Sequence, residues 1–127
     1  MAISQFRARR KITGGMYRKK RKKVRNRGGI SILVGIGTTK RKVVRGRAGN
    51  TRLGLLSNDV VNAYDPKIKK YVKAKIEAVI ESPSNRNYIR RNIMTKGSII
   101  KTDKGNARIT SRPGQEGSLN AVLLGRK

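Results

Sequence analysis

Residues 71–81 (YVKAKIEAVIE) alternate between apolar and polar side chains over eleven positions. The apolar side chains that share one face are Val72, Ala74, Ile76, Ala78 and Ile80. Charged residues at positions 73, 75, 77 and 81 point the other way, and Val79 is the single exception. A period of two residues is typical of a β-strand with one buried face. The pattern therefore predicts a long strand at 71–81 and favours a sheet protein over a helical one.

Shorter segments before and after it have the composition of strands and are separated by turn-forming residues. The further predicted strands are 43–47, 52–56, 60–64, 99–102, 107–111 and 119–124. The turns lie at Gly49-Asn50, Asp65-Pro66-Lys67, Asp103-Lys104-Gly105 and Pro113-Gly114. Helical structure is limited to one short turn over 88–91, for which Asn87 is the predicted cap. These segments predict an all-β fold, either a small antiparallel barrel or a sandwich.

Charge divides the chain into two unequal parts. The first 58 residues contain no acidic side chain, and residues 1–27 alone hold 12 Lys and Arg, for a charge of +12. Such a segment cannot bury enough apolar surface to offset the entropy lost on ordering it. We therefore predict a basic, extended N-terminal arm at 1–27, disordered in isolation and ordered on its partner, and a β domain at 28–127. Met16 and Tyr17 are candidates to anchor one point of the arm.

The overall charge indicates the class of partner. With 33 Lys and Arg against 6 Asp and Glu, the formal net charge is +27. Repulsion within such a chain opposes compaction unless a polyanion neutralises it. Nucleic acid carries the densest negative charge of the common partners, so nucleic-acid binding is expected.

The missing residue types exclude most catalytic chemistry. The chain has no Cys and no His, which removes disulfides, thiolate metal sites and the commonest general base. Its six carboxylates are scattered, and no glycine-rich phosphate-binding motif occurs. The longest apolar stretch, 30–36, is far shorter than the ~20 residues of a membrane span. We therefore expect no enzyme, no metal or other cofactor, no small-molecule substrate, no membrane contact and no homo-oligomer.

Three groups of basic residues are candidates for phosphate contact. The run 18–27 (RKKRKKVRNR) has no compensating acid for 31 residues beyond it, which favours nucleic-acid contact over a solvated charged face or a targeting signal. The group at 40–52 surrounds Gly46 and Gly49, where the backbone could approach a phosphate closely, although an ordinary hairpin turn with exposed cations explains it equally well. The third group is 86–92 (RNYIRRN).

Aromatic residues are too few for a base-stacking platform. There are five in the chain, and no aromatic-rich RNA-recognition strand is present. Tyr88 has two interpretations, a partly buried core side chain or a stacking partner for an unpaired base, and the first is commoner for a lone tyrosine between strands. Recognition is therefore expected to depend on the nucleic-acid backbone and shape.

Several motifs resemble a known family. The segments are 10–15 (RKITGG), 85–93 (NRNYIRRNI) with 95–97 (TKG), 107–117 (ARITSRPGQEG) and 120–123 (NAVL). Together they resemble ribosomal protein eight of the small subunit in archaea and eukaryotes, and the compact length is similar to the archaeal form. The resemblance implies a β-barrel-like fold, no catalytic activity, a cytoplasmic location in the small subunit, and small-subunit ribosomal RNA and neighbouring ribosomal proteins as partners. It also implies that Arg10, Lys11, Thr13, Gly14 and Gly15 belong to an RNA-contacting extension.

Charge and resemblance together give the predicted RNA-binding residues. They are Arg7, Arg9, Arg10, Lys11, Thr13, Gly14, Gly15, Arg18, Lys19, Lys20, Arg21, Lys22, Lys23, Arg25, Arg27, Lys40, Arg41, Lys42, Arg45, Arg47, Gly49, Asn50, Arg52, Arg90, Arg91 and Arg112. The expected function is that of a structural constituent of the small ribosomal subunit that stabilises ribosomal RNA. The alternative is a non-ribosomal nucleic-acid packaging or RNA-chaperone protein that uses the same charge without a fixed site.

Two segments depart from the family pattern. Gly54 and Ser57 stand where the family tends to place arginines, so RNA contacts along that strand are expected to be fewer than at the preceding turn. Residues 28–37 are more apolar than the family's polar linker. They either pack on the barrel or on a neighbouring ribosomal protein, and the sequence does not decide between the two.

Overall fold

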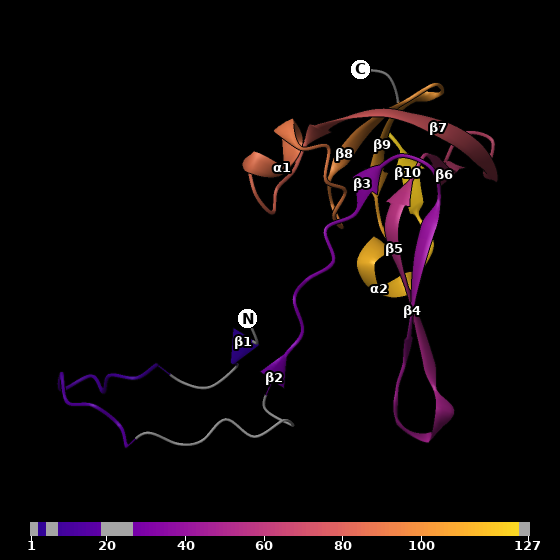
Figure 1. Ribbon diagram of the computed structural model, residues 1–127. Coiled ribbons are helices and arrows are strands. Elements are labelled where there is room, and N and C mark those ends of the chain that lie inside the picture. Colours follow the sequence, from indigo (N-terminus) through magenta and orange to yellow (C-terminus); the bar gives the residue numbers. More distant parts are fainter. Residues whose placement is uncertain (1–2, 5–7, 19–26, 125–127) are drawn as a thin grey trace. The chain divides into compact units, whose positions relative to one another are not determined.

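The computed structural model describes residues 3–4, 8–18 and 27–124, and the chain divides into two compact units, 1–31 and 32–127 (Figure 1). In the first unit, strands β1 (Ile3–Ser4) and β2 (Arg27–Gly28) pair antiparallel. Between them, Arg10 and Met16 form an isolated bridge, and the Tyr17 amide donates to the Arg9 carbonyl at 3.0 Å. Residues 10–15, the first of the motifs above, therefore form a tight turn, in which Gly14 has a left-handed φ of 83°.

The second unit contains a closed five-stranded barrel with the strand order β10-β6-β7-β8-β9. Its strands are β6 (Val60–Asp65), β7 (Lys70–Glu81), β8 (Ile99–Thr102), β9 (Gly105–Ile109) and β10 (Asn120–Leu123). The all-β prediction is confirmed, and the barrel is the form adopted. The expectation of a wholly antiparallel barrel is wrong at one pair, because β10 and β6 run parallel. Five strands that alternate in direction are an odd number, so the first and the last meet in the same direction when the barrel closes.

The interior of the barrel is filled by aliphatic side chains from all five strands. The most deeply buried include Val61, Ala63, Ile100, Ala107 and Ile109. Inward residues alternate with outward ones along each strand, as expected for a small barrel. These residues lie within 28–127, the segment for which the sequence predicts a β domain.

In strand β7 the alternation of inward and outward side chains is interrupted. Its pairing with β8 shifts register between Ile76 and Ala78 and again between Val79 and Glu81. A β-bulge adds one residue to a strand and moves the following side chains to the opposite face. As a result Val79 is only 4% exposed and Ile80 is 46% exposed. The prediction that Ile80 shares the buried face, with Val79 as the exception, is therefore wrong.

A three-stranded sheet with the order β3-β5-β4 lies beside the barrel. Its strands are β3 (Gly35–Ile36), β4 (Lys40–Arg45) and β5 (Thr51–Asn58), and β4 and β5 are joined through the short 3-10 helix η2 (Arg47–Gly49). Just before β3, Val34 is 1% exposed and its carbonyl accepts a hydrogen bond from the Met94 amide at 2.8 Å. The segment 32–36 therefore packs on the barrel. For these residues, this decides between packing on the barrel and packing on a neighbouring protein.

Two one-turn helices complete the unit. Helix α1 (Asn87–Arg90) begins one residue after Arg86, and no side chain caps it. The prediction of Asn87 as the cap is wrong, because Asn87 is the first helical residue and its amide donates to the Asn85 side chain at 2.9 Å. Helix α2 (Pro113–Glu116) occupies the position predicted as a simple turn.

Residues 111–117, which include α2, pack closely against β5 and Ile32. A Cβ atom on Gly114 would lie 3.1 Å from the Ile32 carbonyl oxygen, and one on Gly117 would lie 2.7 Å from the Leu53 Cβ. Gly54 meets the same helix from the other side, since a Cβ there would lie 2.5 Å from the Gly114 carbonyl oxygen. The departure from the family pattern at Gly54 thus coincides with a close backbone contact that leaves no space for a side chain.

Gly117→Ala is expected to lower the free energy of unfolding by about 1–3 kcal/mol. Gly117 has a φ of 67°, which strains any residue with a Cβ, and the added atom would also crowd Leu53. Chemical denaturation of the full chain measures the effect. Gly35→Ala is the matched control, because nothing lies within 4 Å of a Cβ at that position, and its change should stay within about 0.5 kcal/mol. Equal effects of the two substitutions would contradict the proposed packing.

Candidate nucleic-acid interface

The β4–β5 hairpin carries one of the groups of exposed cations in the described part of the chain. All six residues of β4 are exposed, and four of them are cations on an edge strand of the sheet. The cations of the hairpin whose side chains are described are Lys40, Arg41, Lys42, Arg45 and Arg52. Figure 1 shows the hairpin extending away from the barrel past α2, so solvent or a partner can reach it from both sides.

The register of the hairpin places cations on both of its faces. Residues directly opposite each other in an antiparallel pair share a face. Arg45 lies opposite Thr51 and shares its face with Arg41, whereas Arg52 lies opposite Val44 and shares its face with Lys42. Charge on an edge strand also discourages pairing with another chain. That explanation does not cover Arg52, which is on the central strand β5, so the arrangement points to an anion that approaches from either side.

The tip of the hairpin has an unusual backbone. Ala48 has a φ of 57° and Gly49 a φ of 74°, both in the left-handed region. A Cβ on Gly49 would find nothing within 4 Å, so the space around this backbone position is open; phosphate contact there stays a prediction. Gly46 is different, because a Cβ there would lie 3.3 Å from the Asn50 carbonyl oxygen, and its amide already donates to that oxygen at 2.6 Å. Gly46 is thus closely packed within the turn and leaves less room for an approaching phosphate than Gly49 does.

The other predicted residues are distributed over several elements. In the first unit, Arg9, Arg10, Lys11, Thr13 and Arg18 are exposed around the 10–15 turn. There the Arg10 Nη1 donates to the Gly14 carbonyl at 3.4 Å, and the Lys11 Nζ lies 5.5 Å from the centre of the Tyr17 ring. Arg7, Lys19, Lys20, Arg21, Lys22, Lys23 and Arg25 lie outside the described residues. Arg27 falls in β2 and Arg47 in η2.

The remaining cations of the second unit do not all join the hairpin. Arg90 and Arg91 are exposed at the end of α1, which Figure 1 shows to the left of the barrel, away from the hairpin tip. Arg112 is exposed immediately before α2, the helix that packs on β5. The structure therefore brings Arg112 toward the hairpin side and leaves the α1 pair as a separate group. Tyr88, in α1, is half-buried.

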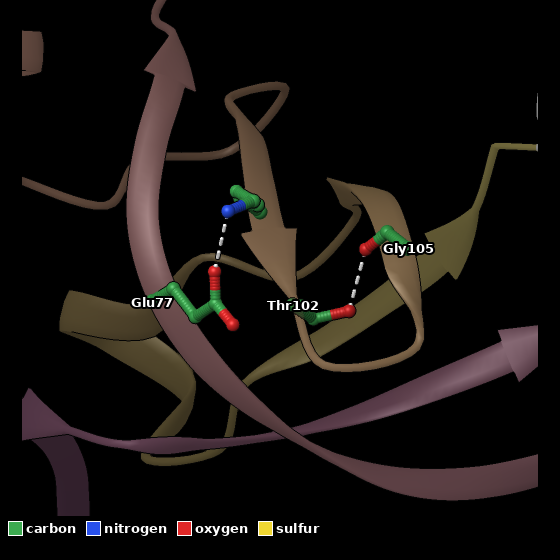
Figure 2. A network of polar contacts seen from close by, with 4 residues as sticks. Glu77, Thr102 and Gly105 are labelled. Atoms are coloured by element: carbon green, nitrogen blue, oxygen red, sulfur yellow. Dashed lines mark hydrogen bonds and ion pairs between the residues drawn. The ribbon is translucent and has the colours of Figure 1, made fainter.

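Acidic side chains do not neutralise the hairpin. Among residues 3–4, 8–18 and 27–124 the one ion pair joins the Lys101 Nζ to a Glu77 carboxylate oxygen at 2.8 Å (Figure 2). The hydrogen bond and the charge of Glu77 raise the pKa of Lys101 above its ordinary value. Figure 2 also shows the Thr102 hydroxyl, which donates to the Gly105 carbonyl at 2.6 Å and closes the β8–β9 turn. Glu77 thus pairs across to β8 rather than with the lysines beside it on β7.

Two open clefts lie on the second unit. One, of about 490 Å³, is bounded by β4, β5 and α2 and includes Arg52 and Gln115 in its lining. The other, of about 440 Å³, lies on the outside of the barrel between β6, β7 and β10 and is lined by Tyr64 and Tyr71. Sequence reasoning missed this second cleft. The signal available was the placement of the two tyrosines at equal distances from the Asp65–Lys70 turn, which brings them opposite each other in a hairpin.

The described residues contain no group of three or more acidic, His or Cys residues able to hold a metal ion. Within the same part of the chain, no helix has both the length and the apolar character needed to cross a membrane.

Comparison with known proteins identifies the family. The chain matches the family described as ribosomal protein S8e over residues 4–124. It belongs to this family. The small ribosomal subunit protein eS8 of Methanocorpusculum labreanum is 48% identical over 116 residues, which cover 91% of this chain and 93% of the relative. The proteins of the same name in Methanosarcina barkeri and Methanocella arvoryzae are 47% and 44% identical, over 92% and 94% of this chain and 94% and 97% of theirs.

Family membership confirms the resemblance drawn from the motifs, including the similarity to archaeal forms. Members of the S8e family are structural ribosomal proteins, so this chain has a structural ribosomal role and is not an enzyme. The matched range 4–124 includes both the 10–15 turn and the whole barrel.

Proposed function

We propose that this S8e protein binds small-subunit ribosomal RNA through phosphate contacts of the β4–β5 hairpin and the basic arm, and so stabilises the folded RNA. The observation that carries the proposal is the set of exposed hairpin cations, none of which has a carboxylate partner among the described residues. Lys and Arg side chains that contact phosphates release condensed counterions, which favours binding strongly at low salt. The family assignment supports the ribosome as the place where this occurs.

Cations on both faces of the hairpin suit a position between two RNA segments. Such a segment neutralises phosphates that would otherwise repel each other. Because the major groove of A-form RNA is too deep and narrow for side chains to read, contacts of this kind recognise the backbone and the shape of the RNA. On this proposal the protein acts in the cytoplasm within the small subunit, with neighbouring ribosomal proteins around it and without self-association.

The cations predicted in the arm and at 90, 91 and 112 would make further phosphate contacts outside the hairpin. Arg10, Lys11, Thr13, Gly14 and Gly15 would present the 10–15 turn to RNA, and the turn's left-handed Gly14 leaves its backbone open, since a Cβ there meets nothing within 4 Å. Arg112 would add a contact beside α2.

Arg41→Gln combined with Arg45→Gln is expected to reduce the dependence of RNA affinity on salt. If each arginine contacts one phosphate, the slope of log affinity against log salt should fall by about 1.4–1.8 in magnitude for the pair. The measurement is fluorescence anisotropy with a small-subunit ribosomal RNA transcript at several salt concentrations. Both residues are exposed and share one face of β4, so the substitutions should not disturb the fold.

Lys96→Gln combined with Lys104→Gln is the control, since it removes the same charge from two exposed positions outside the hairpin. Equal reductions of the slope in the two double variants would show that net charge, not the hairpin, determines binding. Competition with random duplex RNA distinguishes the alternative of a packaging protein or RNA chaperone, which would bind both RNAs alike.

A further inference from the structure

The outer face of β6, β7 and β10 has a chemical character different from the hairpin. Pairing of β6 with β7 sets Tyr64 opposite Tyr71 and Asn62 opposite Lys73. Pairing of β10 with β6 sets Asn120 beside Asn62. Because residues two apart on a strand share a face, these five side chains project from the same side of the barrel wall.

The two tyrosines form an open aromatic corner. Their ring centres are 5.1 Å apart and their planes are inclined by 52°. Tyr64 is half-buried, whereas Tyr71 is 75% exposed, so one face of an aromatic ring is presented to solvent beside a cleft of about 440 Å³. This volume is within the range of roughly 300–1,000 Å³ that small-molecule sites occupy. Tyr71 contributes little to the barrel core; its contact with Tyr64 across the β6–β7 pair stabilises the sheet and leaves the rest of its ring in solvent.

Two side-chain amides complete the lining. The Asn62 Nδ2 donates to the Asn120 Oδ1 at 3.3 Å, and both residues contribute to the cleft. An amide has two donor hydrogens and an acceptor oxygen, so this single hydrogen bond leaves most of their capacity available. An aromatic ring for stacking, together with adjacent amides that can both donate and accept, is the set of groups that proteins use to hold an unpaired nucleobase.

The charged residues near the cleft favour an anionic ligand such as a nucleotide over a cationic one. Lys73 is exposed on the same face, opposite Asn62, and can reach a phosphate next to a bound base. The nearest acid in the sequence, Asp65, follows Tyr64 and belongs to the alternate face, and its Oδ1 accepts a hydrogen bond from the Lys67 amide. The cleft therefore offers aromatic and amide contacts of base size, and Lys73 adds positive charge on the same face beside it.

We propose that this cleft binds an unpaired base of RNA, with Tyr71 stacking on the base, Asn62 and Asn120 bonding to its edge, and Lys73 contacting a flanking phosphate. The inference rests on the proposed RNA-binding function and adds to it a site that recognises a base rather than the backbone. It also changes the expectation drawn from the low aromatic count, because two tyrosines placed together are sufficient for one base.

The test compares Tyr71→Ala with the full unaltered chain in binding a short single-stranded oligoadenylate and an RNA duplex with the same number of phosphates. Removal of one stacking contact should weaken oligoadenylate binding by about 5- to 100-fold and leave duplex binding nearly unchanged. Tyr71→Phe keeps the ring and should bind like the unaltered protein. Ile68→Ala, at an exposed residue outside the cleft, should also have no effect.

The outcomes separate this site from the general function. Unchanged oligoadenylate binding by Tyr71→Ala, or equal losses for single strand and duplex, overturns the base site while duplex binding by the unaltered chain leaves the hairpin proposal standing. Failure of the unaltered chain to bind either RNA overturns both. Ultraviolet crosslinking in assembled small subunits gives an independent measurement. A nucleotide adduct on the peptide containing Tyr71 supports the site, and a crosslink from that peptide to another protein overturns it.

Discussion

Deletion of residues 1–27 is expected to weaken binding of small-subunit ribosomal RNA by at least about a hundredfold at 0.15 M salt. The segment holds 12 Lys and Arg and no acid. Each phosphate contact contributes about 0.7–0.9 to the slope of log affinity against log salt, so three contacts already supply a factor of this size through counterion release. The slope should fall in magnitude by about 0.7–0.9 for each phosphate that the shortened chain no longer contacts. Anisotropy titrations of the truncated and full chains over a range of salt concentrations measure both quantities.

A full-length variant with the order of residues 1–27 scrambled is the matched control, because it keeps the charge of +12 and loses the 10–15 turn. We expect it to keep most of the salt dependence and to lose the preference for ribosomal RNA over random duplex. An unchanged slope after deletion would refute the assignment of phosphate contacts to the arm. The barrel's unfolding midpoint should change little, since its core is built from residues after 31.

The local features of the fold could be predicted from sequence because they depend on neighbouring residues. The turn at Asp103-Lys104-Gly105 joins β8 to β9, where Thr102 pairs with Gly105 as a short hairpin requires. The strand at 60–64 is extended by one residue only, to Asp65. In these segments turn chemistry and alternation agree, and each is sufficient to fix a strand end within a residue or two.

Features that depend on distant residues could not be predicted in the same way. The bulges in β7 arise from its pairing with β8, about twenty residues later, and they reverse the exposure of Val79 and Ile80. The Glu77–Lys101 ion pair and the cleft between β6 and β10 depend on the same closure of the barrel. No window of the sequence contains both partners, so periodicity alone carries no information about them.

The motif at 111–117 illustrates how a family signature combines packing and function. Ser111 accepts a hydrogen bond from the Asn120 amide at 2.9 Å, Pro113 is buried at the start of α2, and Gly117 ends the helix with a left-handed φ. These residues hold β5 against the barrel, and therefore hold the base of the cationic hairpin. In the sequence the motif indicated only the family. In the structure Gly114 and Gly117 make the close contacts with Ile32 and with Leu53 of β5, Ser111 bonds to Asn120 of β10, and Arg112 is the one member of the motif predicted to contact RNA.

Ile100→Ala is expected to lower the free energy of unfolding by about 2–5 kcal/mol, a large part of the roughly 5–15 kcal/mol of a typical domain. Ile100 is 0% exposed in β8, opposite Val79 on β7 and Ala107 on β9. Three deleted carbons at this point leave a cavity that the closed barrel cannot collapse to fill, because hydrogen bonds around its whole circumference fix the separation of the strands. Urea denaturation followed by circular dichroism measures the loss.

Ile68→Ala deletes the same atoms at a position that is 62% exposed, in the turn between β6 and β7, and should cost less than about 0.5 kcal/mol. A similar loss in both variants would mean that Ile100 is not in a closed core. The two variants also separate stability from recognition. If, as proposed, ribosomal RNA binds the folded protein more tightly than the unfolded chain, saturating RNA should raise the unfolding midpoint of Ile100→Ala without changing its affinity per folded molecule. If the apparent RNA affinity of Ile100→Ala falls only in proportion to its unfolded fraction, the core stabilises the fold that carries the interface but does not contact RNA itself.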